Sequence, residues 1–371
     1  MTEDIEAENL YDEEHGPEIT EPFNPKDVDI VAQPMVISNI IDDLKHDDII
    51  LDPDFQRNPN LWDDRKQSRL IESLVIRIPL PSFYFDSDEE DHYEVVDGLQ
   101  RLWSIKRFAV LEPGDPQKLR LSQLEYLHEY DGKTFEELPQ TIQRRIKTQQ
   151  VTAYVIRPGT PDNVRTSIFT RINTGGMVLT PAEIRNSVYR GTPARLLKEL
   201  AETEEFCRAT RNTIKPDRML DREFVNRFLA FYLFGEEKYK GSLDEFMNDA
   251  LAFLKDASQE KLNDYKHDFR STMTLAYDIF GERAFRKLQK NGQYGPINKP
   301  LFEVVGSQFG RLNDAEREKL LNNSASFQQD YIALIQDSEF LEAITMGTGR
   351  IASVRLRHNK FREIVRKAIE V

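Results

Sequence analysis

The chain has 371 residues, enough for two domains, and 39% of them are hydrophobic, which can supply a sizeable core in each. Its 50 Lys and Arg residues against 64 Asp and Glu give a formal net charge of −14, which disfavours broad nonspecific binding to nucleic acid. The single cysteine excludes an internal disulfide. The sequence also shows no signal peptide and no apolar run of bilayer length, so we expect a cytoplasmic protein with no membrane association.

Residues 1–30 are predicted to form a disordered acidic tail. They carry almost no basic residues and are interrupted by glycine and proline, so they cannot bury enough apolar surface to fold. A second interpretation is that the tail mimics nucleic acid and covers a basic groove elsewhere in the chain. In either case the regular alternation of helix and strand begins only near Val36.

The first elements after Val36 are indicated by their periodicity. Apolar residues at helical spacing, with Asp63 or Asp64 as N-cap, predict a helix from Arg65 to Ile76. The aromatic and β-branched segments SFYFD and YEVVD predict two neighbouring strands joined by an acidic turn, and LQRLWSIKRFAV then restores helical spacing. Further on, PQTIQRRIKTQQ predicts a helix and VTAYVIR a strand.

Two later helices are predicted from paired start and stop signals. Each begins with threonine and proline and ends at a glycine: Thr160, Pro161 and Gly175 for the first helix, and Thr180, Pro181 and Gly191 for the second. In the second helix Glu183 adds a capping box. Strand signals nearly vanish after Gly191, so we expect domains at residues 31–191 and 192–371, the second being all-helical.

The stretch YEVVDGLQRLWSIKRF places an acid, a glycine and an arginine where a strand turns into a helix. The first N–H groups of a helix and its dipole attract an anion, which Gly98 would allow to approach and Arg101 would bind. Asp97 would repel that anion unless a divalent cation lies between them or the acid acts as a base. A metal–nucleotide pair would resolve this conflict. Taken alone, however, the five residues favour the alternative, in which Asp97 caps the helix, Gly98 relieves strain and Arg101 makes a surface salt bridge.

Three ordered motifs resemble the N-terminal domain of GmrSD-type modification-dependent restriction systems. They are DPDFQRNPNLWDDRKQSRLIESLVIRIPLPSFYF, the DGQQR-type signature DGLQRL, and FTRINTGGMVLTPAEIRNSVYRG. The resemblance spans about Ile37 to Gly191, and it departs from the family at Leu99, where Gln is usual. It implies an α+β fold in which a ParB/sulfiredoxin-like N-terminal domain precedes the all-helical C-terminal domain.

The resemblance also implies a pocket that binds and hydrolyses a nucleotide. Asp97 and Arg101 are its expected catalytic residues, and Asp97 is also the expected ligand of Mg²⁺ or another divalent cation. The expected nucleotide-binding residues, which match family motif positions, are Gln56, Arg57, Gly98, Gln100, Arg101, Arg171 and Asn173. For the four of these outside DGLQRL, the alternatives are a turn residue, a solvated arginine and the polar end of a capped helix.

The family context implies a regulatory component of a bacterial restriction or anti-phage defence system. Its expected partners are a nucleoside triphosphate, DNA and a separate nuclease subunit, since no His-Asn-His nuclease pattern surrounds RHNK near the C-terminus. Two other functions stay open. One is a ParB-like, Mg²⁺-dependent DNA nuclease or nickase, and the other is a noncatalytic binding module gated by nucleotide.

Two features of the second half of the chain are predicted to have structural roles. The stripe Phe224, Phe228 and Phe231 is predicted to lie in the core, because its spacing is helical. The basic C-terminal stretch RIASVRLRHNKFREIVRKAIEV is predicted to form a solvated amphipathic helix, and the alternative is nucleic-acid contact through basic residues that include Arg357 and Lys360.

Overall fold

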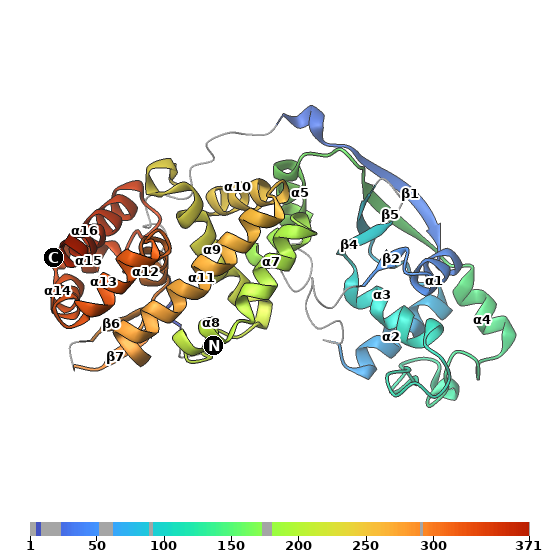
Figure 1. Ribbon diagram of the computed structural model, residues 1–371. Coiled ribbons are helices and arrows are strands. Elements are labelled where there is room, and N and C mark those ends of the chain that lie inside the picture. Colours follow the sequence, from blue (N-terminus) through green and yellow to red (C-terminus); the bar gives the residue numbers. More distant parts are fainter. Residues whose placement is uncertain are drawn as a thin grey trace. The chain divides into compact units, whose positions relative to one another are not determined.

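The computed structural model describes residues 5–8, 24–51, 62–88, 92–172, 180–289 and 292–370. They form two compact units, labelled by element in Figure 1. The sheet unit lies within residues 23–188, and the helical unit lies within residues 189–371 and also includes residues 5–8. None of the described helices is both long enough and apolar enough to span a bilayer.

The described part of the sheet unit is built on a mixed five-stranded sheet with the order β1-β5-β3-β4-β2 (Figure 1). Its strands are β1 (Ile30–Val36), β2 (Ile49–Ile50), β3 (Phe83–Ser87), β4 (Tyr93–Asp97) and β5 (Gln150–Ile156). β5 pairs antiparallel with β1 and parallel with β3, while β4 pairs antiparallel with β3 and parallel with β2. The predicted neighbouring strands SFYFD and YEVVD are confirmed as β3 and β4.

The described part of the sheet unit also contains α-helices and one π-helix. They are α1 (Ile37–Lys45), α2 (Asp64–Ile76), α3 (Leu99–Ile105), the π-helix η2 (Lys106–Val110), α4 (Gln140–Lys147), α5 (Asp162–Ile172) and α6 (Pro181–Val188). Phe83 and Phe85 of β3 pack with Leu74 of α2 and Leu102 of α3 in one hydrophobic core. Burying each such side chain contributes about 1.5–3 kcal/mol, so this core fixes α3 against the sheet.

Two predicted helix starts are confirmed. The Asp63 side chain accepts a hydrogen bond from Lys66 N at 2.8 Å and caps α2, as the sequence predicts. At α6, Thr180 N donates to Glu183 Oε2 and Glu183 N donates to Thr180 Oγ1, which completes the predicted capping box. The predicted stop at Gly175 lies outside the described residues.

The helical unit contains ten α-helices among its described residues. They are α7 (Thr192–Ala201), α8 (Glu204–Ala209), α9 (Leu220–Phe234), α10 (Leu243–Lys255), α11 (Gln259–Phe280), α12 (Lys299–Gly310), α13 (Asp314–Asn322), α14 (Ser324–Gln336), α15 (Ser338–Ala343) and α16 (Ile351–Glu370). Short 3₁₀ turns occur in the sheet unit at η1 (Pro25–Asp27) and η3 (His128–Tyr130). In the helical unit they occur at η4 (Asp217–Met219), η5 (Glu236–Lys238) and η6 (Gly281–Arg283). Phe224, Phe228 and Phe231 are buried in this unit, as predicted.

The expected α+β fold is confirmed, and the second unit is largely helical, but it also contains one short pair of strands. An antiparallel pair, β6 (Arg286–Leu288) and β7 (Tyr294–Ile297), lies between α11 and α12. These strands are too short for an alternating apolar pattern to stand out, and Gly and Pro interrupt β7. Their pairing therefore depends on tertiary contacts that the sequence pattern does not reveal.

Residues 5–8 lie in the predicted disordered tail, and here too the structure differs from the prediction. Ile5 forms a parallel bridge with Ile297, and Glu6 N donates to the Ile297 carbonyl at 2.8 Å. The acidic side chains of this segment meet cations of the helical unit that are far away in sequence. Because composition alone cannot show such partners, it predicts a solvated tail.

The C-terminal helix α16 differs from the prediction of a solvated charged face. Arg357 and His358 are buried, and the Arg357 guanidinium donates to the Glu303 carboxylate and to the Thr348 carbonyl. Lys360 donates to Asp337 at 2.6 Å. Nucleic-acid contact through Arg357 is therefore excluded in this conformation, because the side chain is part of the core.

Candidate functional site

The turn from β4 to α3 requires glycine at position 98. Gly98 has a φ of +107°, in the region that favours glycine, and its carbonyl accepts from Leu102 N at 2.9 Å to begin the helix. A Cβ placed there would come within 2.6 Å of Phe83 Cδ1. Both the backbone angle and the space therefore exclude a side chain.

Arg101 in the first turn of α3 points back toward the end of β4. Its Nη2 donates to Asp97 Oδ2 at 2.7 Å, and its Nη1 donates to the carbonyl oxygens of Pro81 and Ser82. The guanidinium also lies over the Phe83 ring, 4.8 Å from its centroid. Burial lowers the pKa of Arg101, and the neighbouring Asp97 opposes that shift. In this conformation Arg101 holds Asp97 in a fixed orientation.

Asp97 combines this fixed orientation with access to solvent. Its side chain is 41% exposed, whereas that of Arg101 is 9% exposed. Its neighbour across the strands is Tyr84, whose ring stacks on Tyr154 with centroids 5.0 Å apart. Burial, Tyr154 and Asp97 raise the pKa of Tyr84, so its phenol stays protonated at neutral pH. The site therefore presents an ionisable carboxylate next to a hydrogen-bond donor.

Gln100 connects this turn to the start of α2. Its side-chain oxygen accepts a hydrogen bond from Trp62 N at 3.1 Å. Gln56 and Arg57, two of the expected nucleotide-binding residues, precede Trp62 in the chain and lie outside the described residues. Gln100 thus fixes the backbone only five residues after Arg57.

The remaining expected site residues follow β5. Arg171 lies in the last turn of α5 and is exposed, while Asn173 lies outside the described residues. The structure therefore brings Asp97, Gly98, Gln100 and Arg101 together at one turn and leaves Arg171 on a separate helix.

A second group of polar side chains on the same strands was not predicted. Asp86 of β3 lies opposite Glu94 of β4, and both are buried. Arg165 of α5 brings its Nη1 within 3.5 Å of Asp86 Oδ2, which offsets the repulsion between two facing acids. The signal in the sequence is a charged residue inside each of the apolar segments SFYFD and YEVVD.

A divalent cation at this turn would need oxygen ligands from the protein. Within the described ranges, no three His, Cys, Asp or Glu side chains gather into a metal-ligand set. A magnesium ion, however, commonly takes one or two carboxylates from the protein and its other ligands from phosphate and water. The exposed carboxylate of Asp97 is the kind of ligand that this mode uses.

Comparison with known proteins gives one family. Residues 37–190 match the model of the GmrSD restriction endonuclease, N-terminal domain, a match that contains β4, α3 and the turn between them. No curated protein and no solved structure matches the chain. Residues 37–190 are therefore similar to the N-terminal domain of the GmrSD restriction endonucleases.

Proposed function

We propose that the sheet unit binds and hydrolyses a nucleoside triphosphate with Mg²⁺, and that this reaction regulates nucleic-acid cleavage in a restriction system. The observation that carries the proposal is the Asp97 carboxylate, which is exposed but held by Arg101 at a glycine turn that opens a helix. This turn lies inside the part of the chain that matches the model of a restriction endonuclease domain.

The proposed roles follow from the contacts at the turn. Asp97 binds Mg²⁺ or orients the water that attacks the terminal phosphorus, and the bond from that phosphorus to the bridging oxygen then breaks to release phosphate and a nucleoside diphosphate. The backbone N–H groups that open α3 after Gly98 would donate to the phosphates. The bound cation would neutralise phosphate charge and lower the pKa of the water.

Arg101 acts in this scheme as a positioning residue. Its guanidinium is committed to Asp97 and to two backbone carbonyls, so it affects the reaction through the orientation of Asp97. We assign direct phosphate contacts to the other expected residues, Gln56, Arg57, Arg171 and Asn173. Gln100 fixes the backbone at Trp62, five residues after Arg57.

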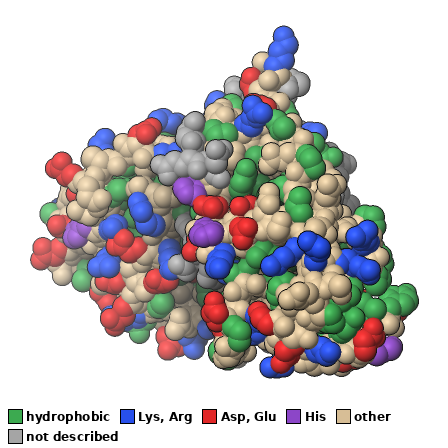
Figure 2. Space-filling model, turned by 90° about the vertical axis from the view of Figure 1, so that its right-hand side faces the viewer, with side chains coloured by type: hydrophobic (Ala, Val, Ile, Leu, Met, Phe, Trp, Pro, Cys, Tyr) green, Lys and Arg blue, Asp and Glu red, His purple; other side chains and the backbone are tan. Residues whose placement is uncertain are grey.

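DNA and a separate nuclease subunit are the partners that we propose for the regulated step. Support for DNA comes from α4, where Arg144, Arg145 and Lys147 are exposed. Lys and Arg side chains gather in a band on this side of the molecule (Figure 2). Such a local basic patch can contact phosphates even though the net charge of the chain is −14.

The test is phosphate release from each triphosphate with Mg²⁺, measured with and without DNA. We expect Asp97→Asn to lower kcat by about 100-fold or more and to change the Kd for triphosphate only slightly. Arg101→Lys keeps the charge but loses the fork, so it should lower kcat less than Asp97→Asn does. Asp88→Asn, at an exposed acid after β3, is the matched control and should retain activity.

Wild-type turnover in Asp97→Asn would remove the proposed mechanism. The same protein also separates the other two functions. Plasmid nicking with Mg²⁺ and no triphosphate, abolished by Asp97→Asn, would assign the site to a nuclease. Tight triphosphate binding without phosphate release would assign it to a noncatalytic module.

A further inference from the structure

Glu8 is buried in the helical unit against polar groups from three distant parts of the chain. Arg227 of α9 donates from Nη1 to Glu8 Oε2 at 2.6 Å and from Nη2 to Glu8 Oε1 at 2.7 Å. Thr348 Oγ1 donates to Glu8 Oε1 at 2.9 Å, and Lys299 Nζ of α12 lies 4.0 Å from Glu8 Oε2. The Glu8 side chain is only 6% exposed. A bidentate guanidinium, a hydroxyl and an ammonium thus surround one carboxylate.

The charge balance of the cluster depends on Glu8. Arg227 Nε donates to Glu303 at 2.9 Å and Arg357 Nε donates to Glu303 at 2.8 Å, so two guanidinium ions share one carboxylate. His358 also contacts Glu303, at 3.0 Å, and burial lowers the pKa of this imidazole, so it adds no charge at neutral pH. Removing Glu8 would therefore leave one positive charge without a counter-charge in a buried cluster, which is costly.

The next carboxylate in the cluster does not replace Glu8. Glu236 Oε2 lies 3.6 Å from His358 Nδ1, and its other oxygen accepts from Arg362. Arg311 is 4.0 Å from the same carboxylate. Glu236 is thus matched by cations of its own, and Arg227 needs an anion from outside the helices.

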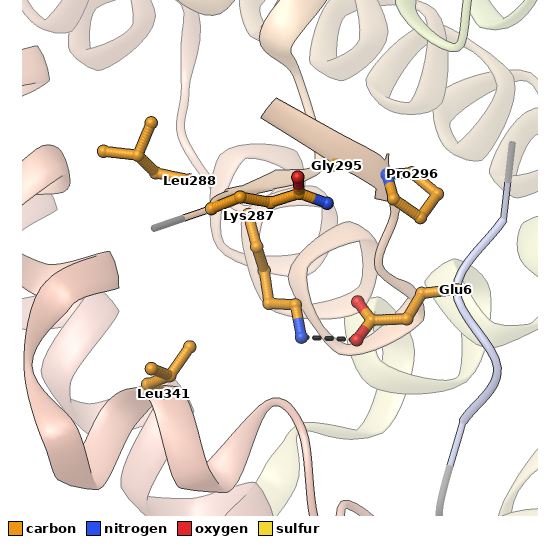
Figure 3. A pocket seen from close by; sticks show the side chains of 7 residues that line it. Glu6, Lys287, Leu288, Gly295, Pro296 and Leu341 are labelled. Carbon is orange, nitrogen blue, oxygen red and sulfur yellow. Dashed lines mark hydrogen bonds and ion pairs between the residues drawn. The ribbon is translucent and has the colours of Figure 1, made fainter. Parts of the chain in front are cut away.

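The rest of the segment is held by few contacts. Its backbone makes one isolated bridge, between Ile5 and Ile297, in place of a continuous strand ladder. The Glu6 carboxylate pairs with Lys287 and accepts from Asn298 Nδ2 at 3.0 Å. Figure 3 shows this ion pair at the edge of a pocket of about 350 Å³, next to Leu341 and Pro296. The segment is therefore attached largely through its two carboxylates.

We propose that Arg227, Lys299 and Thr348 form an oxyanion-binding site, that Glu8 occupies it as an intramolecular ligand, and that the phosphate group of a ligand competes with Glu8. A guanidinium fork binds a phosphate as it binds a carboxylate, through two parallel N–H donors. The hydroxyl and the ammonium supply further donors. Lys287, beside the pocket, offers a second cation for a ligand with more than one phosphate.

The test is thermal unfolding of full-length Glu8→Gln in sodium phosphate and in sodium chloride of equal ionic strength. In chloride we expect the Tm to fall by about 5 °C or more, because Arg227 loses its counter-charge. Phosphate should restore at least half of that loss. Glu339→Gln is the matched control, since it removes an exposed acid paired with Lys360 in the same unit, and its Tm should barely change.

A milder variant keeps the test decisive if Glu8→Gln fails to fold. Glu8→Asp retains the charge on a shorter side chain, so phosphate should raise its Tm more than it raises that of the wild type. A second arm replaces inorganic phosphate with a short single-stranded oligonucleotide. If the oligonucleotide restores the Tm at a lower concentration of phosphate groups than inorganic phosphate does, the ligand is a nucleic-acid backbone. If only inorganic phosphate restores the Tm, the ligand is a small phosphorylated molecule.

Three results would overturn the proposal. One is a wild-type Tm for Glu8→Gln in chloride. Another is a lowered Tm that neither phosphate nor the oligonucleotide raises. The third is an equal response to phosphate in the wild type, Glu339→Gln and the Glu8 variants, which would show that phosphate acts at another place.

Discussion

Gly98 shows how closely the strand-to-helix turn is built. Its positive φ and the Phe83 ring beside it are separate constraints, since one concerns the backbone and the other the available space. Gly159, also in the sheet unit, has a φ of +85° but no atom within 4 Å of the place where a Cβ would lie. The two glycines therefore allow the backbone cost of a side chain to be separated from the steric cost.

Gly98→Ala should lower the free energy of unfolding more than Gly159→Ala does. Both variants place a side chain in the left-handed region, at a cost of about 1–2 kcal/mol. Gly98→Ala also forces a methyl group against Phe83, which adds about 1–3 kcal/mol. Urea unfolding of both variants measures the difference. Equal losses would show that the Phe83 ring moves aside without cost.

At the scale of the element, local signals were sufficient for part of the fold. The Asp63 cap, the Thr180–Glu183 capping box and the alternation in β3 and β4 depend on residues close together in the chain. The π-helix η2 and the pair β6–β7 depend on packing and were not predicted. The glycine turn could be predicted because its residues are adjacent in the chain. The contacts of Arg101 with Pro81 and Ser82 could not be predicted, because these residues are about 20 positions away from Arg101.

The helix α4 carries the prediction about DNA. Arg144→Ala combined with Arg145→Ala should weaken retention on DNA and reduce the slope of log K against log salt by about two, because two phosphate contacts are lost. The matched control is Arg355→Ala combined with Arg366→Ala, which removes two exposed cations from α16. Binding isotherms at several salt concentrations measure both pairs. Weaker binding of the α16 pair alone would place the DNA contact there.

At the scale of the whole molecule, the helical unit encloses an ionic cluster centred on Glu303. Its members come from α9, α12, α16 and residues 5–8, so no window of sequence contains them together. That separation is why the sequence predicts a disordered tail and a solvated C-terminal helix. Burial would raise the pKa of Glu303, but Arg357 and Arg227 lower it to about 2.

This cluster predicts loss of stability in acid. The pKa of Glu303 is lower in the folded than in the unfolded state, so its stabilisation is complete above about pH 4.5 and is lost as the pH falls toward 2. The contribution is about 3 kcal/mol. Burial also lowers the pKa of His358, so its loss of stability begins as the pH falls below about 6.5.

Urea unfolding between pH 7 and pH 2.5 tests this prediction. Stability should fall with decreasing pH, and Glu303→Gln should be less stable at neutral pH but depend less steeply on pH below 4.5. If the variant and the wild type have equal slopes in that range, Glu303 does not contribute to acid unfolding.

The contact between Glu8 and Arg227 has a topological consequence. Residues 5–8 belong to the helical unit and precede the sheet unit in the chain. Residues 23–188 therefore lie within a ring that is closed by the contacts of residues 5–8, which include the buried ion pair of Glu8 and Arg227. Closing a ring of this length restricts the conformational entropy of the chain within it. Releasing residues 5–8 would leave the sheet unit joined to the helical unit by a single linker. A phosphate that displaced residues 5–8 would then increase the conformational freedom of the sheet unit.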